Sequence, residues 1–318
     1  MKKYTISFVM LCIFFLLFIS GCGLNDNTNI DRKFDSEHRA KIFLITKDKV
    51  SPYWNSIDEG CRQAVEEIGF VDYEWRAPIE RESVEQSNCI NQAVADGVNA
   101  ILLSAVSKDD INESLKNADK SGVKIVYVDD AATHDCVATL MTDNKIAGET
   151  AGETMLRAFR ERNITSGTVG IVANEPGALN TSLRDEGFRK AFADSGFTVA
   201  PTIYTNGNPQ IAKDCVIEHS SYIGFFGTNQ TTTSLIGMQI KSLDTKQIVV
   251  GFDVVDDTLD LIRDGTIYAT MKQNANRMGY EGINVAVSAL TGRYNKKNVN
   301  IDTGVTVVTF ENVEQVKK

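Results

Sequence analysis

Short apolar runs alternate with amphipathic segments along most of this chain. The runs lie at residues 42–45, 100–103, 124–128, 169–172, 223–226 and 248–252. After the first run, apolar side chains recur at helical spacing from Trp54 to Ile68. Repeated strand-helix units of this kind predict parallel sheets that are covered by helices on both faces.

These strand-helix units are too many for one compact sheet. Residues 41–318 also exceed the length of about 250 residues that a single hydrophobic core usually organises. A break is expected near residues 142–144, where a β-rich run gives way to a new helix at Ile146. We therefore predict an α/β protein with two Rossmann-like, doubly wound lobes.

The first residues are typical of an exported protein. Lys2 and Lys3 precede an apolar run at residues 6–19, which is shorter than the roughly 20 residues needed to span a bilayer. The run ends in Ile-Ser-Gly-Cys22, which resembles the lipobox of bacterial lipoproteins. That resemblance implies that residues 1–21 are a signal peptide and that Cys22 carries lipid at the extracytoplasmic face of the cell membrane. The alternative is an uncleaved anchor, or an ordinary signal with an incidental cysteine.

Composition narrows the picture further. Residues 22–40 are rich in Asn and Asp and poor in apolar side chains, so we expect them to form a tether. Loss of Lys2 and Lys3 with the signal would take the formal net charge from −9 to −11. An acidic body of this kind argues against a nucleic-acid partner.

Cysteine and histidine usage gives no sign of catalysis or metal binding. Four cysteines of the body are far apart and form no Cys-x-x-Cys pair, which leaves a metal cluster unsupported and a disulfide open. They are Cys61, Cys89, Cys136 and Cys215. The three histidines fall in the tether, a loop and a predicted helix end, away from any nucleophile. We predict a protein that is not an enzyme and that needs no cofactor or metal.

Polar side chains follow four of the predicted strands. In open α/β sheets, ligands collect beyond the carboxyl ends of the strands. The residues at these ends are Asp129, Asp130, Asn229, Asp253 and Gln273. Carboxylates accept hydrogen bonds, and amides both donate and accept them, so the set suits a polyol better than an anion. Each Asp or Asn has an alternative role as the cap of the following helix.

Two adjacent aromatic residues follow the first strand. Tyr53 and Trp54 come directly after Pro52, which suits the first turn of a helix. Their rings could stack on the apolar face of a sugar. The alternative is that they pack the start of their own helix.

The span of residues 41–312 resembles the ribose/xylose/galactose-type substrate-binding proteins of bacterial ABC transporters. The likeness depends on the order and spacing of six short segments, namely residues 51–54, 128–129, 142–144, 184–188, 250–253 and 302–305. It implies the type I periplasmic binding fold, in which two lobes joined by three chain crossings close on a ligand. The N-terminal lobe would hold residues 41–142 and 274–302, and the C-terminal lobe residues 143–273 and 303–318.

The resemblance also assigns ligand contacts. It implies roles for Tyr53, Trp54 and Asp129 in the first lobe, for Asn229 and Asp253 in the second, and for Gln273 at the hinge. Lys47 matches a position that contacts ligand in some members, notably the autoinducer-2 binders, with a solvated loop lysine as the alternative.

Two positions depart from the ribose-binding pattern. Asp130 and Ser182 stand where ribose binders have arginine. Exchange of two five-donor guanidinium groups for an acid and a hydroxyl makes the pocket richer in acceptors, so ribose itself is disfavoured. Asn180, Ser182 and Arg184 become additional second-lobe candidates, although Arg184 is better explained as a brace of its own lobe.

These observations predict a lipid-anchored, extracytoplasmic protein that binds a small sugar, with a pentose such as xylose favoured. Its expected partner is the membrane permease of an ABC transporter. One alternative is a sensing subunit that docks on a membrane histidine kinase or chemoreceptor, and another is an autoinducer-2 binder. A cytoplasmic sugar-responsive repressor is disfavoured by the export signal and by the absence of a basic helix-turn-helix head.

Overall fold

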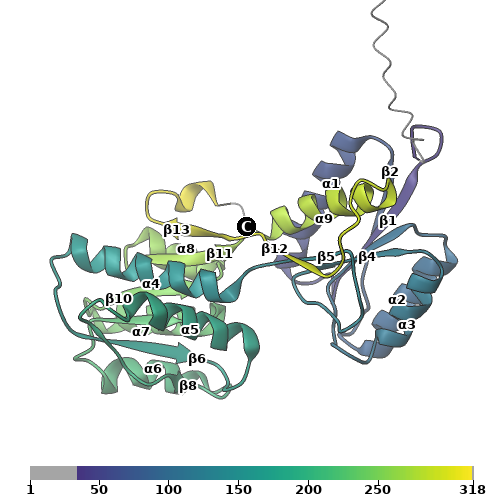
Figure 1. Ribbon diagram of the computed structural model, residues 1–318. Helices are drawn as coiled ribbons and strands as arrows, with labels where there is room; N and C mark the ends of the chain where they lie inside the picture. The colour runs from purple at the N-terminus through teal and green to yellow at the C-terminus, as the bar shows by residue number, and fades with distance from the viewer. Residues whose placement is uncertain (1–33, 317–318) are drawn as a thin grey trace, which may run out of the picture.

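A computed structural model describes residues 34–316. The predicted signal peptide, Cys22 and most of the tether lie outside these residues. Within the described part, no helix combines the length and the apolar character that crossing a bilayer requires. Figure 1 shows two separate α/β lobes that are linked by several chain segments.

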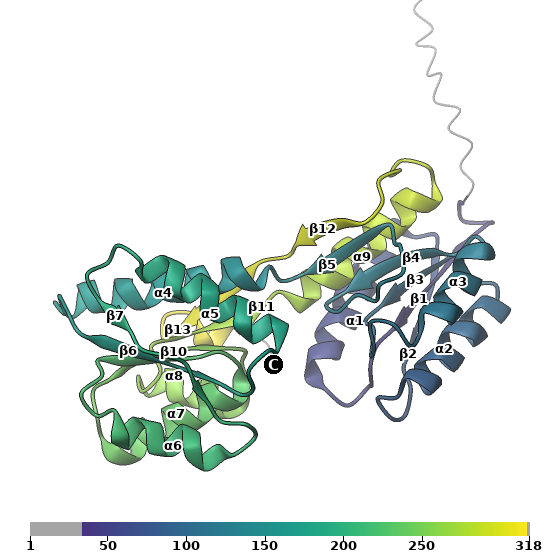
Figure 2. The same cartoon turned by 60° about the horizontal axis from the view of Figure 1, so that its bottom comes forward.

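The first lobe is built on an entirely parallel sheet in the order β12-β5-β4-β3-β1-β2. Its strands are β1 (Ala40–Ile45), β2 (Val71–Arg76), β3 (Ala100–Leu103), β4 (Lys124–Val128), β5 (Ala138–Met141) and β12 (Val299–Asp302). One face packs against α1 (Pro52–Ile68) and α9 (Ala275–Leu290), and the other against α2 (Ser83–Ala95) and α3 (Asn112–Lys120). Figure 2 shows these helices on the two sides of the sheet.

The second lobe repeats this plan in the order β13-β11-β10-β9-β6-β7. Its strands are β6 (Thr168–Ala173), β7 (Thr198–Val199), β8 (Ile203–Tyr204), β9 (Gly224–Gly227), β10 (Ile248–Phe252), β11 (Ala269–Gln273) and β13 (Val305–Thr309). One face packs against α4 (Asn144–Glu161) and α5 (Leu179–Phe192). The other packs against α6 (Pro209–Glu218), α7 (Gln230–Leu243) and α8 (Asp256–Arg263), with the short helix η1 (Val313–Gln315) near the end of the chain.

The predicted fold of two doubly wound lobes is confirmed, with one difference in strand direction. β13 runs antiparallel to β11, whereas the sequence pattern predicts parallel strands only. The direction follows from the path of the chain, because β11 leads out of the second lobe and β13 leads back into it. The sheet therefore ends in an antiparallel edge strand.

The chain crosses between the lobes three times. The crossings follow β5 at Thr142, β11 at Asn274 and β12 at Thr303. Polar contacts join them to one another. The Asn274 side-chain amide donates to the Thr303 carbonyl oxygen (3.0 Å), and the Asp143 amide donates to the Asp302 carboxylate (2.9 Å). We propose these crossings as the boundaries of the two lobes.

In each lobe, the helix that follows a crossing touches, through glycines, the helix that comes after the first strand of that lobe. In the first lobe, a Cβ atom on Gly279 of α9 would lie 2.0 Å from the Ile57 carbonyl oxygen of α1. In the second lobe, a Cβ atom on Gly187 of α5 would lie 1.9 Å from the Lys145 carbonyl oxygen of α4. Only glycine permits such approach, so backbone contacts attach both crossings to their lobes.

Substitution of Gly279 should test this attachment. Gly279→Ala places a methyl group against backbone that cannot move aside, and we expect the free energy of unfolding to fall by at least about 2 kcal/mol. Gly282→Ala is the matched control in the same helix, since its methyl group meets side-chain atoms of Leu102 (2.8 Å) and Val128 (3.5 Å) rather than backbone. Urea denaturation followed by circular dichroism measures both. Equal losses for the two variants would contradict the assignment.

Candidate functional site

Two aspartates occupy equivalent positions in the two lobes. Asp129 directly follows β4, and Asp253 directly follows β10. Both have left-handed backbone conformations, with φ of 66° and 63°. Both donate their amide to the neighbouring strand at 2.9 Å, to the Leu140 oxygen and the Met271 oxygen. Few residues other than glycine adopt this conformation, and it concentrates at functional sites, so the pair marks a candidate site.

The first lobe surrounds Asp129 with side chains that the sequence predicts. The Tyr53 hydroxyl donates to the Asp129 carboxylate at 3.0 Å. Lys47 forms an ion pair with Asp130, whose side chain is exposed. Trp54 is only 4% exposed and packs edge-to-face on Tyr53, with ring centroids 5.1 Å apart. Tyr53 therefore stands beside the acid, while Trp54 packs the start of α1.

The electrostatics of the site join the two lobes. Burial raises the pKa of Asp129 to about 7, and Asp130 adds to this effect while Lys47 opposes it. Asp253 of the second lobe raises the pKa of Asp129 further. Burial also raises the pKa of Tyr53, and Asp129 and Asp253 act in the same direction. An acid of the second lobe thus acts on two titratable side chains of the first.

The second lobe holds Asp253 through the hinge strand. The Gln273 side-chain amide donates to the Asp253 carboxylate at 2.9 Å. Arg184 is buried behind this pair, with its guanidinium 3.5 Å from the Phe252 ring centroid. It donates to the Asn144 side chain (2.8 Å) and to the Thr228 carbonyl oxygen (2.9 Å). Arg184 therefore braces α4, α5 and β9 against one another.

The remaining second-lobe candidates lie at helix starts. Asn229 caps α7, because its side-chain oxygen accepts from the Thr232 amide at 2.9 Å, while its side-chain N–H groups stay oriented away from that bond. Asn180 and Ser182 lie exposed in the first turns of α5. Among the described residues, neither of these two side chains is hydrogen-bonded to Asp129 or Asp253.

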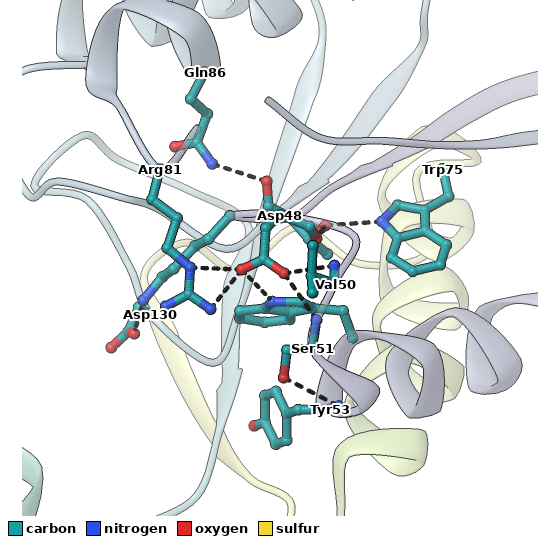
Figure 3. A network of polar contacts seen from close by, with 11 residues as sticks. Asp48, Val50, Ser51, Tyr53, Trp75, Arg81, Gln86 and Asp130 are labelled. Carbon is teal, nitrogen blue, oxygen red and sulfur yellow. Dashed lines mark hydrogen bonds and ion pairs between the residues drawn. The ribbon is translucent and has the colours of Figure 1, made fainter. Parts of the chain in front are cut away.

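A buried carboxylate that the sequence analysis missed organises the first-lobe side of the site. Asp48 is 5% exposed and accepts hydrogen bonds on both oxygens. One oxygen accepts from the amides of Val50 (2.8 Å) and Ser51 (3.0 Å). The other accepts from the Trp54 indole (3.2 Å) and the Arg81 guanidinium (2.6 Å). Figure 3 shows Asp48 between Arg81 and the loop of Val50 and Ser51. Asp48 thereby fixes the loop that carries Lys47 and leads into Tyr53.

A second buried side chain links this loop to its neighbours. Gln86 of α2 donates to the carbonyl oxygens of Thr46 (3.3 Å) and Ser104 (2.9 Å) and accepts from the Val106 amide (2.9 Å). The sequence offers a signal for part of this arrangement, because an Asp in a loop often accepts hydrogen bonds from the amides that follow it. The contact between Asp48 and Arg81 has no such signal, since Arg81 belongs to another strand-helix loop.

The site offers carboxylates, amides and a tyrosine hydroxyl, which suits a neutral molecule with several hydroxyl groups. Within residues 34–316, no group of three or more His, Cys, Asp or Glu side chains is arranged to hold a metal ion. The four cysteines whose pairing the sequence leaves open are all free.

Comparison with known proteins gives a consistent result. The family model described as a periplasmic binding protein domain matches residues 42–294. The ribose import binding protein of Salmonella typhimurium is 22% identical over 280 residues, which covers 84% of this chain and 90% of the relative. The D-apiose import binding protein of Paraburkholderia graminis is 22% identical over 272 residues, with coverage of 81% and 85%.

Solved structures share the two-lobed fold. An arabinose-binding protein from Geobacillus stearothermophilus has a TM-score of 0.80 at 24% identity, covering 88% of this chain and all of its own. A Burkholderia graminis solute-binding protein in complex with D-arabinose has a TM-score of 0.71 at 26% identity, with coverage of 88% and 98%. A chain from the XylFII–LytSN complex has a TM-score of 0.72 at 26% identity, with coverage of 86% and 99%.

The raised pKa of Asp129 predicts a pH-dependent effect of Asp129→Asn. Because the folded protein holds the Asp129 proton up to about pH 7 and the unfolded chain loses it near 3.8, the wild type loses stability as the pH rises through this window. Asparagine tolerates the same backbone and carries no charge. We expect its stability relative to wild type to increase by about 2 kcal/mol between pH 5 and pH 8.

Thermal denaturation across this pH range measures the effect. Asp244→Asn is the control, because Asp244 has a similar backbone conformation (φ 49°) and a fully solvated side chain that is 93% exposed. Its effect should not vary with pH. A constant difference between wild type and Asp129→Asn would show that Asp129 is ionised throughout.

Loss of the Asp48 charge should destabilise the first lobe. Asp48→Asn removes the charge that holds Arg81, and its side-chain N–H groups would face other hydrogen-bond donors. We therefore expect the free energy of unfolding to fall by about 2 kcal/mol at pH 7. The protein has two tryptophans, Trp54 and Trp75, whose indoles bind Asp48 and the nearby Thr46, so their fluorescence during urea denaturation reports the change. Asp260→Asn removes a solvent-exposed partner of Arg263 and should change stability by less than about 0.5 kcal/mol. A loss no larger than this control would refute the organising role of Asp48.

Proposed function

The chain belongs to the periplasmic binding protein family, and we propose that it captures a small sugar, with a pentose such as xylose favoured, between its two lobes. It would then present the sugar to the membrane permease of an ABC transporter. The observation that carries this proposal is the pair of aspartates, Asp129 and Asp253, which end equivalent strands of the two lobes in the same unusual conformation. Each lobe thus contributes a carboxylate to one ligand.

The chemistry of the site supports a neutral polyol as the ligand. Asp129 and Asp253 accept hydrogen bonds from sugar hydroxyls, and Gln273 can both accept and donate. Tyr53 provides an aromatic ring beside Asp129. Asn229 keeps its side-chain N–H donors available while its oxygen caps α7. An anionic ligand is disfavoured, because Asp129 already experiences the charges of Asp130 and Asp253.

We expect the choice among sugars to depend on two residues of the site that differ from the ribose-binding pattern. Asp130 and Ser182 stand where ribose binders have arginine, and Asp130 is paired with Lys47. A pocket with fewer fixed donors selects ligands whose hydroxyls act mainly as donors. Trp54, Asn180 and Arg184 complete the proposed ligand-binding set, and Trp54 and Arg184 act through the side chains that they position.

We place the protein at the extracytoplasmic face of the cell membrane, held by lipid on Cys22. The proposed lipobox and the family to which the chain belongs both support this location. We attribute no reaction to it, and the curated relatives are named as binding proteins of import systems.

A second candidate function is ligand sensing. It keeps the fold and the ligand but replaces the permease with a membrane histidine kinase or chemoreceptor. The similarity to a chain from the XylFII–LytSN complex, in which a related fold is joined to a second protein, supports this candidate. The autoinducer-2 alternative depends on Lys47, which in this structure is engaged by Asp130.

Ligand screening with site variants tests the proposal. The purified protein should gain thermal stability with at least one member of a panel of D-xylose, L-arabinose, D-ribose, D-galactose and autoinducer-2. Asp253→Ala should weaken binding of that compound at least 100-fold by calorimetry, because it removes an acceptor and frees the Gln273 amide. Asp244→Ala, on the exposed surface, should bind normally. If folded wild type responds to none of these compounds, the sugar proposal fails.

A further inference from the structure

Three apolar side chains stand out from the first lobe beside the candidate site. Val50 is 87% exposed, Ile79 88% and Val84 70%. Val50 lies in the loop between β1 and α1, Ile79 in the loop between β2 and α2, and Val84 in the first turn of α2. Because β1 and β2 are parallel, both loops lie at the same edge of the sheet as Lys47 and Tyr53. We call these three residues the apolar rim.

The loops that carry the apolar rim are fixed by hydrogen bonds. The Asp48 carboxylate holds the Val50 amide at 2.8 Å, and the Glu85 carboxylate holds the amide of Ile79 at 3.0 Å. Arg81 joins the two loops, because it belongs to the second and binds Asp48 of the first. Figure 3 shows Val50, Asp48 and Arg81 in this arrangement. Ordered loops lose little entropy on binding, so the rim is suited to recognition.

Acidic side chains gather at the Ile79 loop of the apolar rim, whereas the exposed Lys49 beside Val50 donates to the Trp75 carbonyl oxygen at 2.6 Å. Arg81 is committed to Asp48, which leaves Glu80 and Glu82 exposed. In the part of the chain that the structure describes, neither of these glutamates forms an ion pair. Asp110 also lies here, because the Ser83 hydroxyl donates to it at 3.2 Å. This charge repels an anionic lipid surface and a second copy of the same rim, and it favours a partner with basic side chains.

We propose that the apolar rim, with Glu80 and Glu82, is a docking surface for the extracytoplasmic face of a membrane protein. The partner would offer an apolar socket ringed by Lys and Arg. This inference deepens the proposed function, on which it rests for the identity of the partner as a permease or sensor. The loop that presents Val50 also carries Lys47 and leads into Tyr53, so the docking surface adjoins the ligand site.

The second lobe also exposes an apolar side chain beside the candidate site, at one position. Leu179, at the start of α5, is 62% exposed and follows the loop after β6, the first strand of its lobe. That loop is the counterpart of the loop that carries Val50. A partner that contacts Val50 and Leu179 together would respond to the separation of the two lobes, and therefore to ligand.

Photo-cross-linking in cells of the native host tests the docking surface. The full-length protein carries p-benzoylphenylalanine in place of Ile79, and mass spectrometry identifies the cross-linked product. We expect one integral membrane protein, with the yield reduced at least fivefold by the combined substitutions Glu80→Lys and Glu82→Lys. The control places the same probe at Ile217, which is 53% exposed in α6 of the second lobe, and should give no such product. The proposal would be overturned by cross-links to lipid or to a second copy of the protein. It would also be overturned if the probe at Ile217 gave the same product in equal yield, or if charge reversal left the yield unchanged.

Ligand binding separates this proposal from the proposed function. Purified Ile79→Glu and Ile79→Ala should bind the identified sugar with unchanged affinity and keep the thermal stability of the wild type. In cells, Ile79→Glu should lower the yield of the membrane product from a probe at Val50 at least fivefold. If the wild type binds no sugar of the panel, the sugar proposal fails while the cross-linking result still decides the docking surface. An unchanged yield from Val50 would refute the surface.

Discussion

The two-lobed arrangement depends on close contact between pairs of helices at the hinge. α9 and α4 each follow a chain crossing, and they lie against α1 and α5, the helices after the first strand of each lobe, with glycines in the contact. Backbone then touches backbone, so a crossing cannot shift without moving the whole helix pair. Any change in lobe separation must therefore be absorbed at Thr142, Asn274 and Thr303 rather than inside a lobe. In the proposed closure of the lobes, the strand ends that carry Asp129 and Asp253 would keep their local geometry.

The site itself carries an electrostatic cost that a ligand can relieve. Asp129 is buried close to Asp130 and under the influence of Asp253, with Lys47 and the Tyr53 hydroxyl as its compensating neighbours. Left-handed backbone at both aspartates adds strain. Hydroxyl donors placed between the lobes would stabilise the ionised carboxylates and draw the two acids together. These unfavourable features of the site would thus favour the proposed closure on a polyol.

The sequence predicted the features that depend on local pattern. Alternation of strands and helices indicates two parallel lobes, and the polar residues after each strand are the ones that the structure places at the carboxyl edges, including Asp129, Asp253 and Gln273. Features that depend on register between distant segments were not predictable. The Asp48–Arg81 contact joins two different loops, and the approach of Gly279 to Ile57 requires the packing of α9 on α1. The direction of β13 follows from the route of the chain.

The same polar network supports both the proposed ligand site and the proposed docking surface of the first lobe. Asp48 holds the Val50 amide on one side of its loop and the Trp54 indole on the other, and Trp54 packs on Tyr53. In the proposed function, a displacement of Tyr53 by ligand would reach Val50 through only two buried side chains, Trp54 and Asp48. Since Arg81 ties Asp48 to the loop of Ile79, both parts of the apolar rim share this support. A partner docked there would contact the groups that position the ligand, which is the physical basis for coupling capture to delivery or to signalling.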